Sequence, residues 1–144
     1  MKKIPKKKER PGLDRYGRNA LINSVIDNDL VSAKAQLKAG ADINLQDDNG
    51  WTALHFAAQA FNEEIIGYLL KNKANPNLQN SYGNSPLWVA LFNCEGQKTK
   101  VFDEFLKYGA DPKLKNYSDS SPLDLAETVA NFDLKKYFPK HFRK

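Results

Sequence analysis

Apolar residues recur along the chain in short helical patterns of two kinds, which alternate. The first kind opens on a small polar residue, has a leucine two residues later and then carries alanines, as around Leu54. The second kind has apolar residues at the i, i+3, i+4 spacing of one helix face, as in Ile65, Ile66, Leu69 and Leu70. We therefore predict pairs of short helices that share one apolar core.

The alternating pattern is an internal repeat. The phrases DRYGRNALINSV at Asp14, DDNGWTALHFAA at Asp47 and NSYGNSPLWVAL at Asn80 are separated by 33 residues, and NYSDSSPLDLAE at Asn116 follows after 36. The second halves also align, as LKAGADINLQ, LKNKANPNLQ and LKYGADPKLK. A fixed period of this length predicts a stack of similar helical units.

Turn and cap residues mark the same four units. Glycine supplies the positive φ of a tight turn at Gly17, Gly50 and Gly83, whereas Asp119 takes this place in the last unit and predicts a distorted or short turn there. Two residues later stand good N-cap types: Asn19, Thr52, Ser85 and Ser121. The left-handed residue that ends the second helix is predicted at Gly40 and Gly109, with Lys73 at the corresponding place.

This period and these phrases resemble the ankyrin repeat. The resemblance implies an all-α fold, an ankyrin-repeat solenoid of four helix-turn-helix units joined by β-hairpin-like fingers. Three extra residues in the third unit are expected within 93–100, between its two helices. The expected organisation is a basic, disordered tail at 1–13, an ankyrin-repeat domain at 14–138 and a basic C-terminal end at 139–144. The repeats within the domain are expected at 14–46, 47–79, 80–115 and 116–138.

Charge divides the chain into an acidic body and two basic ends. Residues 1–13 and 135–144 each carry a net charge of +5, and the whole chain carries +5, which leaves −5 for residues 14–134. The first segment is too charged to fold alone and is expected to be disordered. It is either a solubilising arm or a contact for nucleic acid or an acidic surface. Near the other end, Phe132, Leu134, Tyr137 and Phe138 are spaced as a helix that covers the last repeat.

Candidate catalytic chemistry is weak in this sequence. His55 is the most suggestive residue, but the equivalent places hold Ile22, Trp88 and Asp124, so a structural role is favoured. No phosphate-binding glycine loop, nucleophile elbow or paired histidine spacing occurs. We expect that the protein is not an enzyme and that it binds neither a cofactor nor a metal ion. Cys94 is the single cysteine and, at the edge of the inserted loop, is a candidate for an exposed thiol.

The resemblance also implies where a partner binds. Partners of ankyrin-repeat proteins usually contact the finger tips and the exposed faces of the first helices, which together form a concave surface. Tyr and Trp often anchor interfaces, although such rings could also stiffen the stack by packing on neighbouring fingers. The candidate partner-binding residues are Tyr16, Arg18, Asp48, Trp51, Gln59, Tyr82, Asn84, Phe92, Asn93 and Tyr117.

These features predict a non-enzymatic protein-binding module that is cytoplasmic, has no membrane span and is a monomer when free. The wording of the repeats is also similar to small bacterial ankyrin proteins that act as immunity proteins, or antitoxins. That similarity implies an inhibitor that covers a toxin's active site, and an acidic body suits a basic nuclease. Nucleic acid is not the expected partner of this module. The alternative is a scaffold or adaptor that associates with nucleic acid or an acidic surface through its basic N-terminal tail.

Overall fold

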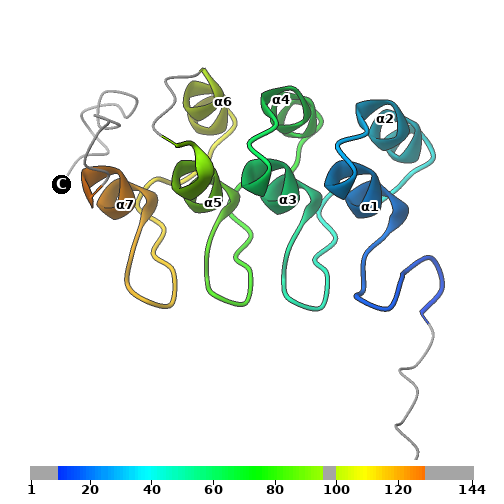
Figure 1. Ribbon diagram of the computed structural model, residues 1–144, viewed down its shortest axis with the longest axis horizontal. Coiled ribbons are helices and arrows are strands. Elements are labelled where there is room, and N and C mark those ends of the chain that lie inside the picture. Colours follow the sequence, from blue (N-terminus) through cyan, green and yellow to red (C-terminus); the bar gives the residue numbers. More distant parts are fainter. Residues whose placement is uncertain (1–9, 96–99, 129–144) are drawn as a thin grey trace, which may run out of the picture.

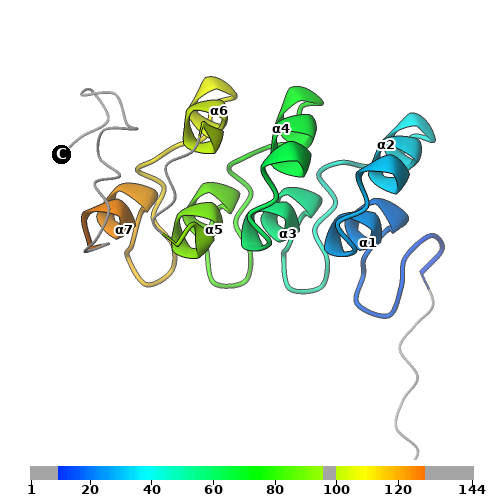
Figure 2. The ribbon, with the colours of Figure 1, turned by 45° about the horizontal axis from the view of Figure 1, so that its top comes forward.

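The computed structural model describes residues 10–95 and 100–128, in which seven helices form a stack. Figures 1 and 2 show two rows of helices side by side, with a third row of loops below them. The helices are α1 (Ala20–Ile26), α2 (Leu30–Lys38), α3 (Ala53–Gln59), α4 (Glu63–Lys71), α5 (Pro86–Asn93), α6 (Val101–Lys107) and α7 (Pro122–Thr128). The described residues contain no strand, and the all-α repeat solenoid predicted from the sequence is confirmed.

The first helix of each unit begins where the sequence predicts. In each case the cap side chain accepts a hydrogen bond from the backbone N–H three residues later, which satisfies a donor that the helix leaves unpaired. Pro86 and Pro122 occupy the first position of α5 and α7, where a proline lacks no useful N–H. The predicted cap residues are therefore the actual boundaries of these helices.

We call the four loop tips the fingers, and they comprise residues 14–18, 47–51, 80–84 and 116–120. In each finger the first residue donates its N–H to the carbonyl of the fifth, as from Asn80 to Asn84 at 3.1 Å. The fourth finger keeps this bond, from Asn116 to Ser120 at 2.9 Å, although Asp119 replaces glycine. The prediction of a distorted finger is wrong, because Asp119 adopts the left-handed conformation itself, at φ 63°.

Neighbouring fingers are joined to one another through their backbones. The second residue of each finger donates to the third residue of the finger before it, as from Ser81 to Asn49 at 2.9 Å. This approach leaves no room for a side chain at Gly50, where an added Cβ would lie 2.8 Å from Cα of Asn80. Gln79 adds a further link, because its amide donates to the carbonyl oxygens of Gly83 in the third finger and of Lys115 just before the fourth. The fingers thus form one continuous ladder.

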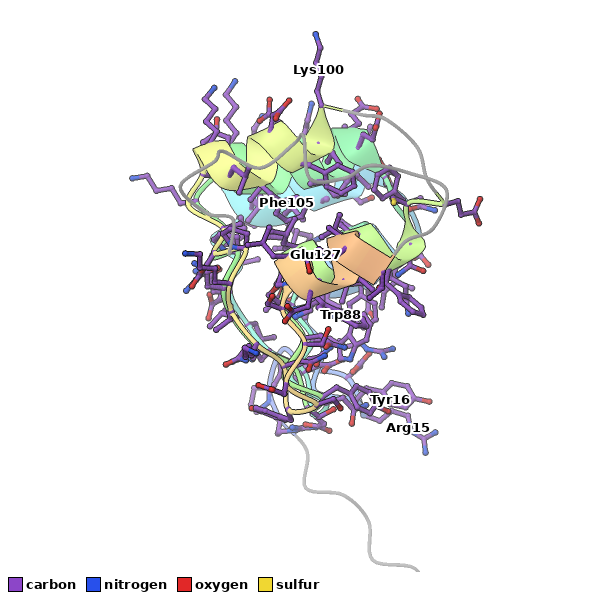
Figure 3. The ribbon with its side chains drawn as sticks, turned by 90° about the vertical axis from the view of Figure 1, so that its left-hand side faces the viewer. Arg15, Tyr16, Trp88, Lys100, Phe105 and Glu127 are labelled. Carbon is purple, nitrogen blue, oxygen red and sulfur yellow. The ribbon has the colours of Figure 1, made fainter. Side chains whose placement is uncertain are left out.

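The core lies between the two rows of helices. Each first helix contributes a leucine that is at most 2% exposed, and these are Leu21, Leu54, Leu87 and Leu123. The second helices contribute their predicted apolar faces, including Ile66 and the fully buried Phe105 (Figure 3). Alanines such as Ala57 and Ala90 are fully buried, so that successive first helices pack closely. The apolar spacing of the sequence therefore predicts the core directly.

Cys94 differs from its prediction. The residue is only 1% exposed, and its Sγ lies 3.2 Å from the carbonyl oxygen of Leu91. Helix α5 is one residue longer than α1 and α3, so Cys94 caps the helix and packs into the core instead of entering the loop. Only Glu95 and residues after it belong to the expected insertion, of which residues 96–99 lie outside the described residues.

Residues 10–13 contact the first two fingers. The guanidinium of Arg10 forms two hydrogen bonds with the carboxylate of Asp48, at 2.6 and 3.0 Å. The backbone N–H of Leu13 donates to the carbonyl of Arg10, which closes a turn. Residues 10–13 therefore join the first two fingers. Residues 1–9 and the predicted C-terminal helix lie outside the described residues. Within the described residues, no helix is long and apolar enough to cross a membrane.

Candidate protein-binding face

We call the surface made by the fingers and the exposed sides of the first helices the finger face. In the view down the stack, Tyr16 extends from the finger tips and Trp88 lies between the first helices and the fingers (Figure 3). A hollow of about 200 Å³ opens on this face between the second and third units. It is lined by Trp51, Gln59, Tyr82, Asn84, Trp88, Val89, Phe92 and Asn93, and we call it the aromatic pocket.

Six of the ten candidate residues from the sequence come together in the aromatic pocket. Trp88 and Val89 complete it, and the sequence analysis missed both. Trp88 stands at the place of His55 in the repeat, but its indole is larger than an imidazole. The size of this ring was the signal that could have identified Trp88 as a surface residue.

The pocket walls are held by contacts among the rings. Trp88 and Phe92 are one helical turn apart on α5 and stack with centroids 5.3 Å apart and planes 11° apart. Trp51 packs on Phe56 at 5.0 Å, so part of its ring stiffens its own unit. Tyr82 and Phe92 remain 68% and 65% exposed. Large apolar rings with this exposure are available to a partner.

Three candidates outside the pocket lie on the first two fingers: Tyr16 and Arg18 on the first, and Asp48 on the second. The guanidinium of Arg18 lies 4.8 Å from the centroid of Tyr16 and 5.0 Å from that of Phe56. Its Nε also bonds the buried carboxylate of Asp47 at 3.2 Å. Asp48 is engaged by Arg10, and this hydrogen bond raises the pKa of the Arg10 guanidinium. Arg18 and Asp48 are thus fixed by neighbours within the chain.

Tyr117 lies apart from the pocket. It occupies the second place of its finger, whereas Tyr82 occupies the third, and it packs against Gly83 of the preceding finger. Its ring is still 72% exposed. The aromatic residues among the candidates therefore lie in three places: the aromatic pocket, the first finger around Tyr16 and the fourth finger.

His55 joins the second and third units. Its Nδ1 accepts from the backbone N–H of Thr52 at 3.1 Å, and its Nε2 lies 2.8 Å from the carbonyl oxygen of Asn84. Because a carbonyl can only accept, the proton of the neutral ring is on Nε2. Burial lowers the pKa of His55 to about 4, against the opposing effects of the Asn84 hydrogen bond and the Asp47 charge. This neutral ring has a structural role.

Trp88 makes the equivalent link one unit further along. Its indole N–H donates to Oγ of Ser120 at 3.3 Å, and Ser120 holds the place in the fourth finger that Asn84 holds in the third. The donor has changed from imidazole to indole while the connection between units is kept. The larger ring extends from this link to the pocket, which explains how one residue serves both the stack and the surface.

A buried polar atom near the pocket has no partner. The side-chain oxygen of Asn80 accepts from the N–H groups of Tyr82 and Asn84, which fixes the orientation of the amide. Its Nδ2 is buried and forms no hydrogen bond with any described residue. An unsatisfied buried donor typically costs about 1–3 kcal/mol, so its presence requires an explanation.

The neighbouring fingers supply that explanation. There, the corresponding side chain bonds the fifth residue of the preceding finger: Asp47 pairs with Arg18, and Asn116 with Asn84 at 2.7 Å. Before Asn80 that fifth residue is Trp51, whose side chain has no acceptor. A ring at position 51 thus leaves the Asn80 amide unpaired. Sites that break a packing rule without local gain are often functional.

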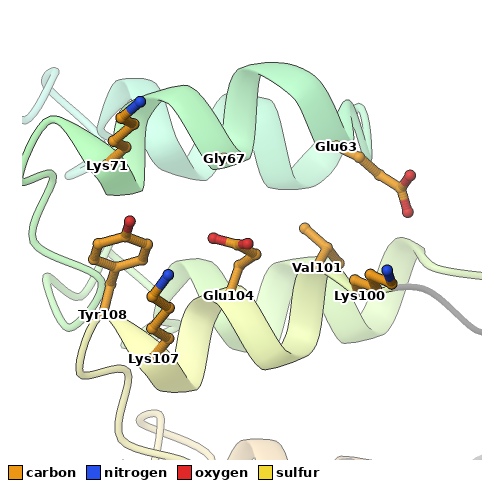
Figure 4. A pocket seen from close by; sticks show the side chains of 8 residues that line it. All are labelled: Glu63, Gly67, Lys71, Lys100, Val101, Glu104, Lys107 and Tyr108. Atoms are coloured by element: carbon orange, nitrogen blue, oxygen red, sulfur yellow. The ribbon is translucent and has the colours of Figure 1, made fainter.

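A second hollow, of about 470 Å³, lies on the other row of helices, between α4 and α6 (Figure 4). It is lined by Glu63, Gly67, Lys71, Lys100, Val101, Glu104, Lys107 and Tyr108. At the place of Gly67 the first unit has Lys34, whose Nζ lies 5.2 Å from the Tyr68 centroid. The hollow exists because Gly67 lacks such a side chain. Its charges are mixed, so it presents no single chemistry to a ligand.

Two observations on the described residues concern catalytic chemistry. These residues contain no group of three His, Cys, Asp or Glu side chains that could hold a metal ion. His55 is buried and engaged at both nitrogens, and it faces a backbone carbonyl where a general base would face a substrate.

Comparison with known proteins identifies the class. The family model described as ankyrin repeats (3 copies) matches residues 21–116, and the chain belongs to this family. Repeats of this family are generally non-enzymatic modules for protein–protein interaction. The matched span includes the whole aromatic pocket.

Individual relatives share the repeats over part of their length. SH3 and multiple ankyrin repeat domains protein 2 of Homo sapiens is 27% identical over 129 residues, covering 89% of this chain and 7% of its own. An ankyrin repeat protein of Rickettsia felis is 33% identical over 109 residues, covering 69% and 48%. Notch-regulated ankyrin repeat-containing protein of Xenopus tropicalis is 46% identical over 54 residues, covering 38% and 47%. The chain thus spans less than half of each of these relatives.

Proposed function

We propose that this chain is a non-enzymatic module that binds another protein through its finger face, with the aromatic pocket at the centre of the interface. The carrying observation is the pair of exposed rings Tyr82 and Phe92 beside the two tryptophans. Interfaces concentrate their binding energy in a few aromatic side chains that sit in pockets and lose water on binding. The unpaired Asn80 amide supports this proposal, because Trp51 costs stability where it stands.

The proposal is tested by capture of a partner from native lysate with immobilised full-length protein. Trp51→Ala and Tyr82→Ala are expected to weaken the complex by about 1–3 kcal/mol each, which is roughly 5-fold to 150-fold in Kd. Circular dichroism should show unchanged helicity, since neither side chain belongs to a helix. The measurement is quantitative titration of each variant against the captured protein.

Val31→Ala is the matched control for this experiment. Val31 is 81% exposed, but it lies on α2 in the other row of helices. It should retain wild-type affinity. A protein captured equally by the wild type, both pocket variants and the control would contradict binding through the finger face. A chain lacking residues 1–9 should also bind normally, whereas loss of binding would favour an adaptor that uses the basic tail.

A narrower form of the proposal is that the partner is a toxin domain and that the chain is its intracellular immunity protein. Two observations support it: the wording of the repeats, and the net charge of the described residues, which is −4 from 11 Lys or Arg and 15 Asp or Glu. An acidic surface accelerates association with a basic nuclease. In this test the product of the neighbouring reading frame is expressed as the toxin, and co-expression of this chain should restore growth of the cells. Trp51→Ala should reduce this restoration. Equal toxicity with and without the chain would refute this narrower proposal.

A further inference from the structure

We infer that the aromatic pocket receives one large uncharged side chain of the partner, of the leucine, methionine or phenylalanine type, and discriminates against charged side chains. This inference rests on the proposed function and specifies the chemistry of its central contact. It draws on the size of the pocket, the arrangement of its rings, the absence of charge among its lining residues and the polar groups at its rim.

The size of the pocket fits a single side chain. Sites for drug-sized molecules usually enclose about 300–1,000 Å³, and this one encloses about 200 Å³. Val89 is only 4% exposed and lies on the same helix as Trp88 and Phe92. The ring contacts described above hold these walls before a partner arrives, so that little order must be gained on binding.

The charge of the pocket favours a neutral occupant. None of its eight lining residues is charged. Two ion pairs engage charged residues of the first two fingers, Arg18 with Asp47 and Arg10 with Asp48. A buried lysine, arginine or glutamate would lose its hydration here without a counter-charge, which is unfavourable.

The rings are also poorly placed to bind a cation. A cation is attracted to the open face of an aromatic ring. Here Trp88 and Phe92 cover one face of each other in a nearly parallel stack, and Phe56 packs against Trp51. The rings therefore act mainly as an apolar wall.

Three amide side chains complete the rim with neutral hydrogen-bonding groups. The Gln59 amide forms no hydrogen bond to any described residue, and Nδ2 of Asn84 is likewise available. Asn93 donates from Nδ2 to the carbonyl of Val89 at 2.8 Å, which leaves its Oδ1 as an acceptor. Donors and acceptors of this kind match the backbone N–H and C=O groups on either side of an apolar anchor.

The pocket can be tested without a known partner, because the two tryptophans of the chain, Trp51 and Trp88, both line it. Tryptophan fluorescence of the full-length protein, excited at a wavelength that tyrosine does not absorb, then reports on this site. The probes are the N-acetyl amides of leucine, phenylalanine, alanine, arginine and glutamate. The leucine and phenylalanine probes are expected to bind in the millimolar range, and the other three at least about tenfold more weakly.

Gln59→Glu provides the decisive variant, since it adds a charge to the rim without changing the shape of an exposed side chain. This variant should bind the leucine probe more weakly and the arginine probe more tightly than the wild type, each by roughly threefold or more in Kd. Gln36→Glu makes the same change on α2, away from the pocket, and should alter neither.

Preference for the arginine or glutamate probe would overturn the inference, and so would the absence of a saturable fluorescence change with every probe. Neither result would depend on partner capture, so the proposed function would stand or fall separately. Conversely, the leucine probe could be preferred while Trp51→Ala leaves the affinity for the captured partner unchanged. That result would refute the proposed function but not the inference about the pocket.

Discussion

The imidazole of His55 shows how one residue can connect two units of a stack. It is fully buried, it caps its own helix through Thr52, and it bonds the next finger at Asn84. The contact at Nδ1 requires the neutral ring with its proton on Nε2, whereas the bond from Nε2–H to Asn84 is compatible with both protonation states. Protonation would replace the acceptor at Nδ1 with a second donor, directed at the Thr52 N–H.

The pH dependence of stability follows from this burial. The pKa of His55 is about 4 in the folded protein and 6.5 for the unperturbed side chain. Between pH 6.5 and 4 the unfolded chain therefore binds a proton that the folded chain does not. The free energy of unfolding should fall as pH drops through this window, by at most about 3 kcal/mol, and this loss should level off below pH 4.

Urea denaturation at pH 7.5, 6, 5 and 4.5 measures this effect. His55→Gln lacks the titrating group and should show a much flatter profile above pH 5, although it is less stable at pH 7.5. Parallel profiles for the two proteins would show that His55 does not cause the loss. Asp47, whose charge acts on the imidazole, is present in both proteins, so it does not account for a difference between the two profiles.

At this scale the sequence predicted roles that depend on local geometry. Asn19, Thr52 and Ser85 are caps because a short polar side chain reaches an N–H three residues later, and no distant contact is involved. The pocket role of Trp88 and the unpaired Asn80 amide depend on the neighbouring finger, which is 32 residues away in one case. A pattern within one unit carries no information on such contacts.

Helix α4 contains a glycine that no contact explains. Gly67 lies in the middle of the helix, and an added Cβ would meet no atom within 4 Å. Glycine in a helix interior costs about 1 kcal/mol relative to alanine, because the unfolded chain is more flexible. Its effect here is to leave the hollow between α4 and α6 open.

Gly67→Ala should therefore raise the free energy of unfolding by about 0.5–1 kcal/mol, measured by urea denaturation. Gly40→Ala is the matched control, since Gly40 also has free space around it but has φ of +93°. That variant should lose stability by about 1 kcal/mol or more, because alanine is strained in the left-handed region. Destabilisation by Gly67→Ala would show that the helix needs glycine for a reason that its backbone does not reveal.

At the scale of elements, the sequence predicted which helices exist better than where they end. Cap and turn residues located the start of every first helix. The additional residue of α5, after which Cys94 packs into the core, has no local signal in the sequence. In the fourth finger, the bonds that Asn116 forms with Ser118 and Ser120 hold the turn in which Asp119 takes the place of glycine.

The whole molecule is a row in which each unit packs mainly on its neighbours (Figure 1). In such a row, stability is approximately the sum of unit and interface contributions, and an end unit can unfold alone. The central interface joins α3 to α5 and carries the His55 link, whereas α7 packs on α5 from one side.

Leucine-to-alanine changes at equivalent positions test this behaviour. Leu54 and Leu123 are 1% and 2% exposed, so each change should leave a cavity that costs about 2–5 kcal/mol locally. In hydrogen exchange, Leu123→Ala should remove protection from α7 while α1 to α4 keep theirs. Leu54→Ala should lower protection throughout the described helices. Uniform loss in both variants would indicate a single all-or-none unit.

The aromatic pocket takes Trp51 and Gln59 from one repeat and its other six lining residues from the next. Under the proposed function, recognition is therefore encoded at the junction between two repeats. Copying either repeat alone, as gene duplication commonly does in tandem arrays, would lengthen the protein without creating a second such site. A new specificity would require substitutions in both repeats that line such a pocket. Exchanging one of these repeats between homologues should abolish the binding preference of the original pocket.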